Sequence, residues 1–120
     1  MPLEDPVSPA SIQRLLLRLG ATPNYTGFQY AADAIWLALQ DQRRLLLITK
    51  ELYPAVASRH HTSKFAVERD IRTVISVIWR ANPQLLKKLA RYEIPEKPSA
   101  SQFLSMITAA LLLSRHQPEP

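Results

Sequence analysis

The feature that most constrains this chain is its content of residues that interrupt helices: its 120 residues include ten prolines and only two glycines. Between the prolines, leucine and alanine recur at the three- and four-residue spacing of amphipathic helices, and the apolar alternation typical of strands is almost absent. Proline lacks an N–H and interrupts a helix interior, so each internal proline marks a helix start or a loop. The sequence predicts an all-α fold of about six to seven helices.

Capping residues predict where the first two helices begin. Ser8 followed by Pro9 predicts a helix through Leu19, which Gly20 ends. The pair Thr26 and Gln29 has the spacing of a capping box and predicts a second helix from Gly27 to about Gln40. Tyr25 and Tyr30 flank this start as a hydrophobic staple would.

The remaining start signals are Pro54, Thr62 or Ser63, Asn82-Pro83, and a Ser99–Gln102 capping box. The helices that we expect from these signals and from the apolar spacing cover about 42–52, 54–59, 63–79, 83–92 and 100–115. Together they predict one helical domain over 1–120, with proline-rich tails at about 1–8 and 116–120.

Composition narrows the class of protein. An apolar share of 47% with 21% charged residues is ordinary for a folded domain. The absence of cysteine excludes disulfides, thiolate zinc sites and cysteine nucleophiles. The longest apolar stretches are far shorter than the roughly 20 residues of a membrane span, and no signal peptide pattern opens the chain. We expect a soluble cytoplasmic protein with no membrane contact.

Positive charge is concentrated in the middle of the chain. The formal net charge is +5, but the segment Arg43–Arg91 alone holds eleven Lys/Arg and three acidic residues, while the rest of the chain is net negative. Clustered Lys and Arg are typical of a nucleic-acid surface. A solvated basic face without a partner is the alternative that charge alone leaves open.

A short helix, a brief turn and a long helix over 53–79 have the arrangement of a helix-turn-helix, whose second helix enters the DNA major groove. On a helical wheel of the long segment, one arc is apolar and must face the core: Val67, Ile71, Val74, Ile75 and Ile78. The opposite arc is mostly polar and carries Phe65, Arg69, Arg72, Thr73 and Ser76, flanked by Lys64 and Glu68. Guanidinium and carboxylate groups suit guanine and cytosine edges, but an amphipathic helix with a merely hydrated face remains the alternative.

Several motifs in this region resemble the C-terminal effector domain of sporulation stage zero protein A. Its pattern is approximately I-T-K-x-L-Y-P-x-I-A, then T-T, then V-E-R-A-I-R-H-A-I-E-V-A-W. The matching positions here are Ile48-Thr49-Lys50, Leu52-Tyr53-Pro54, Ala57, Thr62, Val67-Glu68-Arg69, Ile71-Arg72, Ile75 and Val77 through Trp79. The stretch 27–35 and the set Lys97-Pro98, Phe103 and Met106 extend the resemblance over about residues 11–115.

The resemblance implies a helical domain of about six helices that binds double-stranded DNA, as one copy or as a homodimer. It assigns base contacts to Glu68 and Arg69 and a groove or backbone contact to Arg72. The other candidate DNA-binding residues surround the start of the same helix: Arg59, Thr62, Ser63, Lys64, Phe65 and Thr73. The family also carries a receiver domain, which 120 residues cannot contain, so we expect a stand-alone relative or an excised domain.

The chain departs from the family pattern at the positions nearest to the predicted DNA contacts. Ala66 stands where the family has arginine, and Asp70 replaces alanine, so the charge that faces phosphate is reduced. These departures leave a second hypothesis open, a protein-interaction module that has lost DNA binding. Its contact surface would be the last helix, through Leu104, Ile107, Leu111 and Leu112.

Other kinds of site have little support in the sequence. His60 and His61 are adjacent and lack a third ligand at useful spacing, so we expect His60 to fill a partly buried slot at the turn. Trp36 and Trp79 are expected to be core residues. Nothing resembles a catalytic triad, a carboxylate pair or a phosphate-binding glycine loop, so no enzyme activity, cofactor or small-molecule substrate is predicted.

Overall fold

The structure is a computed structural model that describes residues 7–116, so the predicted tails lie almost wholly outside the described residues. Within them the chain is all-α and contains no strand, as predicted. The helices are α1 Pro9–Leu19, α2 Thr26–Gln40, α3 Tyr53–Arg59, α4 Lys64–Ala81, α5 Pro83–Ala90 and α6 Ala100–His116. Two irregular turns, η1 Gln42–Leu46 and η2 Ile48–Leu52, join α2 to α3. None of the described helices is both long and apolar enough to cross a membrane.

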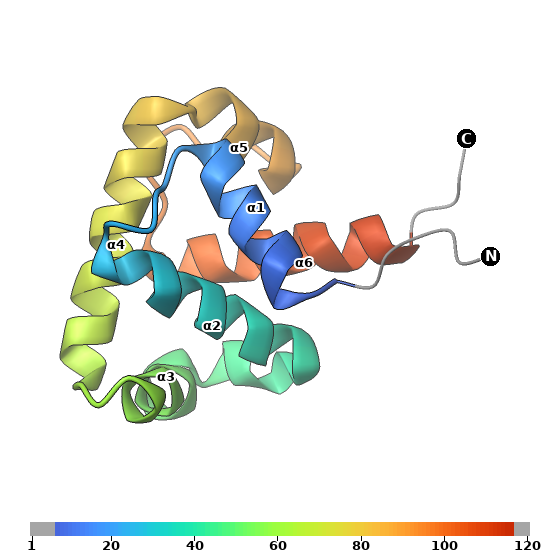
Figure 1. The fold of residues 1–120 in the computed structure, drawn as a ribbon. Helices are drawn as coiled ribbons and strands as arrows, with labels where there is room; N and C mark the ends of the chain where they lie inside the picture. Colours follow the sequence, from blue (N-terminus) through green and yellow to red (C-terminus); the bar gives the residue numbers. More distant parts are fainter. Residues whose placement is uncertain (1–6, 117–120) are drawn as a thin grey trace.

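The centre of the fold is α2, which packs against α1, α4 and α6. Most of its residues are buried, because Ala31, Ala34 and Ala38 allow neighbouring helices to approach closely on several sides. The long helix α4 runs along one side of the molecule, with α3 at its N-terminal end and α5 folding back at its C-terminal end (Figure 1). This arrangement leaves one face of α4 uncovered.

Most of the predicted caps form. The Ser8 hydroxyl accepts a hydrogen bond from the Ser11 N–H at 3.1 Å, and Gly20 ends α1 with a left-handed φ of 110°. At the start of α6, the Ser99 hydroxyl accepts from the Gln102 N–H at 3.1 Å, and the Ser99 N–H donates to the Gln102 side chain at 2.9 Å. The second predicted capping box is therefore confirmed.

The first predicted capping box is wrong. Helix α2 begins at Thr26, one residue early, and its N-cap Tyr25 has no side-chain hydrogen bond. Gly27 lies in the first turn of α2, where an added Cβ would lie 2.0 Å from the carbonyl oxygen of Asp70 in α4. The first turn of α2 therefore packs directly against α4, and no side chain caps it.

The predicted helix over 42–52 is also wrong, because the segment divides at Leu47 into a 3₁₀ turn and a π turn. Pro54 explains the second part: its ring would clash with the carbonyl of Lys50 in an uninterrupted α-helix. In η2 the Leu52 N–H bonds instead to the Leu47 carbonyl five residues earlier, at 3.2 Å, and this wider turn leads directly into α3. The split leaves Leu46 81% exposed.

Both glycines of the chain lie where another segment meets α4. A Cβ on Gly20 would lie 2.5 Å from the Cβ of Ala81, and one on Gly27 would lie 2.0 Å from the Asp70 oxygen. Helices α1 and α2 with the turn between them, which we call the α1–α2 unit, therefore contact α4 near its middle and at its C-terminal end.

Helix α4 extends to Ala81, two residues beyond the prediction, and α5 stops at Ala90, two residues short of it.

Candidate nucleic-acid interface

The segment from α3 to α4 forms a helix-turn-helix. Residue His60 closes α3 through a hydrogen bond from its N–H to the Val56 carbonyl at 3.2 Å, and the Thr62 N–H bonds to the Ala57 carbonyl at 3.0 Å. Between them His61 adopts the left-handed conformation, with φ of 55°. A histidine thus occupies the backbone state that glycine commonly supplies in such turns, at a modest cost in strain. Of the two predicted caps for α4, Ser63 is the one used: its hydroxyl accepts from the Ala66 N–H at 3.1 Å.

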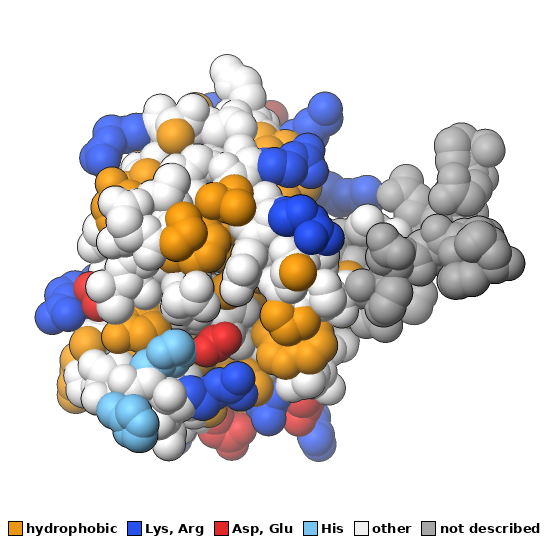
Figure 2. Space-filling model, in the orientation of Figure 1, with side chains coloured by type: hydrophobic (Ala, Val, Ile, Leu, Met, Phe, Trp, Pro, Cys, Tyr) orange, Lys and Arg blue, Asp and Glu red, His pale blue; other side chains and the backbone are white. Residues whose placement is uncertain are grey.

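The turn is fastened to α2 by Asp33. The Asp33 carboxylate lies 2.5 Å from Nε2 of His60 and 3.7 Å from Nε of Arg59. The His60 ring also meets the Tyr30 ring edge to face, with centroids 5.1 Å apart. The prediction that His60 fills a partly buried slot is confirmed, and Arg59, a predicted DNA contact, is engaged by a carboxylate. Figure 2 shows histidine, acidic and basic side chains gathered over this end of the molecule.

The helical wheel orients α4 correctly. All five residues of the predicted core arc are buried: Val67, Ile71, Val74, Ile75 and Ile78. On the other side Arg69, Arg72 and Thr73 are exposed, and Phe65 is 73% exposed. The amine of Lys64 lies 5.5 Å from the centre of the Phe65 ring, so a cation and an aromatic face are paired at the free end of the helix.

Two polar residues of the predicted outer arc are engaged within the protein. Ser76 is partly exposed, and its hydroxyl accepts a hydrogen bond from the Lys97 amine at 2.9 Å. The Thr73 hydroxyl donates to the Arg69 carbonyl at 3.3 Å. The free polar surface of α4 therefore lies mainly in its first three turns.

One flank of this surface, which we call the closed flank, consists of Asp70 against Gly27 of α2. The Asp70 carboxylate holds the neighbouring Arg69 through two hydrogen bonds, from Nε at 3.0 Å and from Nη2 at 3.3 Å. The Arg69 side chain remains 68% exposed, whereas that of Asp70 is 21% exposed. Hydrogen bonding to this carboxylate raises the pKa of Arg69 above its ordinary value, so the guanidinium stays positively charged. The sequence does not indicate this pair, because the helical wheel directs adjacent side chains about 100° apart.

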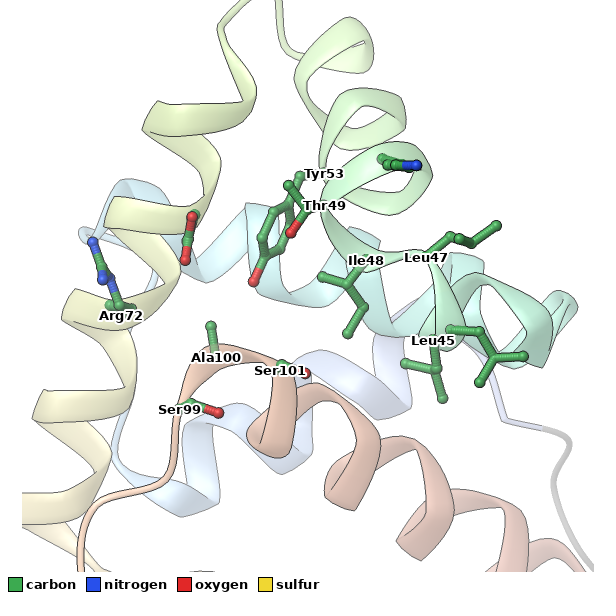
Figure 3. Close-up of a pocket in the computed structure, with 12 residues that line it drawn as sticks. Leu45, Leu47, Ile48, Thr49, Tyr53, Arg72, Ser99, Ala100 and Ser101 are labelled. Carbon is green, nitrogen blue, oxygen red and sulfur yellow. The ribbon is translucent and has the colours of Figure 1, made fainter.

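The other flank, the open flank, consists of Glu68 and Arg72 on α4 with Tyr53 of α3 behind them. These three residues line a cavity of about 470 Å³ that also reaches η1, η2 and the start of α6 (Figure 3). Tyr53 is only 2% exposed, and burial, reinforced by the negative charge of Glu68, raises its pKa to about 12. The sequence motif singled out Tyr53, but nothing in it indicated a cavity.

The basic residues of the middle segment are spread over several elements, from η1 to α5. Arg43 pairs with Asp41 at 3.0 Å on η1, and the Lys87 amine lies 5.4 Å from the centre of the Trp79 ring. Within the described residues, no cluster of three His, Asp or Glu side chains is placed to hold a metal ion.

Two of the four residues that the interaction-module hypothesis places on the surface of the last helix belong to the core. Leu104 and Ile107 are fully buried in the core, and Leu111 and Leu112 are partly buried against it. The expectation that these four side chains exceed the needs of the core is therefore wrong for the first two. Leu104 and Ile107 are buried because α6 packs against α2, α4 and α5.

The fold and the exposed start of α4 define the class: a helical domain organised around a helix-turn-helix. Residues 12–111 match the family described as sporulation initiation factor Spo0A C terminal, and the chain belongs to this family of DNA-binding effector domains. The resemblance inferred from the motifs is confirmed over most of the chain.

Proposed function

We propose that this protein is a sequence-specific regulator of transcription that inserts the first turns of α4 into the DNA major groove. The observation that carries the proposal is the half-exposed Glu68 beside the exposed Arg69 and Arg72, on a helix-turn-helix whose opposite face is fully buried. Proteins of this architecture contact base edges with the N-terminal half of the second helix.

Each candidate residue has a role that its chemistry supports. Arg69 can donate two hydrogen bonds to O6 and N7 of guanine, and Glu68 can accept one from the cytosine amino group. Phe65, exposed beside them, suits the methyl group of thymine. Phosphate contacts are proposed for Lys64, Arg72, Arg59, Thr62 and Ser63, and Thr73 lies at the far edge of the contact. A pair of copies on two half-sites would place two such helices in successive turns of the groove.

Asp70 adds an orienting element to this proposal. It occupies Nε and one hydrogen of Nη2 on Arg69, and so leaves Nη1 and the second hydrogen of Nη2 free. That free edge is still a two-donor edge that matches the two acceptors of guanine. Asp70 therefore restricts Arg69 to one approach and repels phosphate beside it.

The test is a paired titration after selection of a preferred site from a random duplex library. Arg69→Ala should remove most of the preference for the selected duplex over a random one, because one bidentate pair supplies about 1–3 kcal/mol of discrimination. Lys64→Ala is the matched control: it should weaken both duplexes alike and lower the salt slope by about one. If Arg69→Ala keeps the wild-type ratio, base recognition does not depend on this arginine, and a protein-interaction role becomes the better proposal.

A further inference from the structure

The cavity on the open flank lies where five elements of the fold meet, including α3 through Tyr53. Its walls come from η1 and η2, from α4, and from the first turn of α6, and its volume of about 470 Å³ is within the range of small-ligand sites. It is next to the proposed DNA contacts, because Glu68 and Arg72 line it as well. A ligand there would lie beside the residues proposed to contact bases.

One polar group, at the tip of a buried side chain, is aimed into this cavity without a protein partner among the described residues. Tyr53 is 98% shielded from solvent, its hydroxyl points into the space (Figure 3), and no described residue forms a hydrogen bond with it. This hydroxyl is protonated at neutral pH and able to donate, since burial raises its pKa to about 12 from an ordinary value that is already near 10. The hydroxyl oxygen itself is not sealed from water, so a ligand that accepts from it would replace solvent in the cavity.

The opposite wall offers further donors. Ser99 and Gln102 satisfy each other at the start of α6, but Ala100 and Ser101, which line the cavity, carry two of the first N–H groups of a 17-residue helix. Such N–H groups have no acceptor within their own helix, and the helix dipole makes this end attractive to anions. The cavity thus combines a phenolic donor with a helix N-terminus.

The charged side chains of the lining are positive on balance. Lys50 and Arg72 contribute two positive charges and Glu68 one negative charge, which also acts on the Tyr53 hydroxyl. An anion with several acceptor oxygens fits the donors better than a neutral ligand, and phosphate has the tetrahedral oxygens to accept from separate walls.

We propose that this cavity binds a phosphate group through the Tyr53 hydroxyl and the first N–H groups of α6. The phosphate has two sources: the DNA backbone beside the bases contacted by α4, which rests on the proposed function, or a small phosphorylated molecule, which does not.

The experiment uses Tyr53→Phe, which removes one oxygen and keeps the ring that packs in the core. Tyr92→Phe is the matched control, because Tyr92 is exposed and outside the cavity. Titration of the wild type with inorganic phosphate, followed by amide NMR, should shift the signals of Ala100 and Ser101. Tyr53→Phe should weaken this binding at least threefold, with Tyr92→Phe unchanged.

The second arm measures binding to duplex DNA in a phosphate-free buffer. If the backbone is the source, Tyr53→Phe weakens selected and random duplexes by the same factor of at least three. If a small molecule is the source, only the phosphate titration changes, and this result supports the proposal even for a protein that binds no DNA. Wild-type behaviour of Tyr53→Phe in both arms overturns it.

A purely structural role for the hydroxyl is separated by stability. Because the oxygen has no partner, Tyr53→Phe should melt at the wild-type temperature or above it in phosphate-free buffer. A lower melting temperature combined with unchanged phosphate binding would mean that the hydroxyl serves the fold, and the proposal would fail.

Discussion

The two flanks of α4 solve opposite packing problems. On the closed flank the backbone of Asp70 touches α2 at Gly27 so closely that a single Cβ would collide with it. On the open flank Glu68 and Arg72 stand back from Tyr53 and leave a cavity of about 470 Å³. The contrast teaches that the closed flank fixes the position of α4 against α2, whereas the open flank leaves space for a ligand.

The largest effect on stability should come from Ile71, which lies on the core side of α4 between the two flanks. Ile71 is fully buried on the core side of α4, and Ile71→Ala should lower the free energy of unfolding by about 2–5 kcal/mol. Urea denaturation followed by circular dichroism measures it. An unchanged midpoint would contradict the orientation of α4.

The closed flank alone is tested by Gly27→Ala. The new Cβ meets backbone atoms of Asp70, which cannot rotate away, so we expect a loss of about 1–3 kcal/mol or more. Gln29→Ala, an exposed position of the same helix, is the control and should change little. Equal stability of the two variants would show that the helices are not in contact at Gly27.

On the open flank, Tyr53 should make the stability of the fold depend on pH in the alkaline range. Burial raises the pKa of Tyr53 to about 12 from an ordinary value near 10, so the folded protein holds this proton more tightly than the unfolded chain. The resulting stability is complete below about pH 10 and is lost as the pH rises toward 12. Tyr53→Phe should therefore flatten the loss of stability over this interval, as followed by thermal melting at a series of pH values. Parallel curves for the two proteins would place the Tyr53 hydroxyl in solvent.

The smallest change in stability is expected from Asp70→Asn. An exposed ion pair contributes about 0–1 kcal/mol, so the unfolding midpoint should barely move. The effect on DNA specificity should be larger, because Arg69 is no longer restricted. Random duplexes should bind more tightly, and the ratio of the affinities for the selected and the random duplex should fall. A ratio that rises would mean that Asp70 competes with DNA for Arg69.

The sequence predicts a structural feature when the residues that determine it lie close together along the chain. The core arc of α4 and the Ser99–Gln102 cap depend on residues within one or two helical turns, and the sequence indicates both. The close packing of α2 on α4 depends on Gly27 meeting a carbonyl 43 positions later, and no local pattern carries that information.

The same reasoning applies to the candidate site. The outward residues of α4 follow from its periodicity, so the exposure of Arg69 and Arg72 is predictable from the amino-acid sequence. The Asp33–His60 contact joins segments 27 residues apart, and the cavity joins Tyr53 to the start of α6. Such features arise from tertiary packing alone.

The two glycine contacts have a thermodynamic consequence for DNA binding. Asp70 and Ala81 are eleven residues apart, so the α1–α2 unit holds α4 at points separated by about 16 Å. A helix held in this way is already ordered before it meets the groove, and association does not require it to fold. The heat-capacity change of binding should then match the apolar surface buried at the interface, without the larger negative value that accompanies coupled folding.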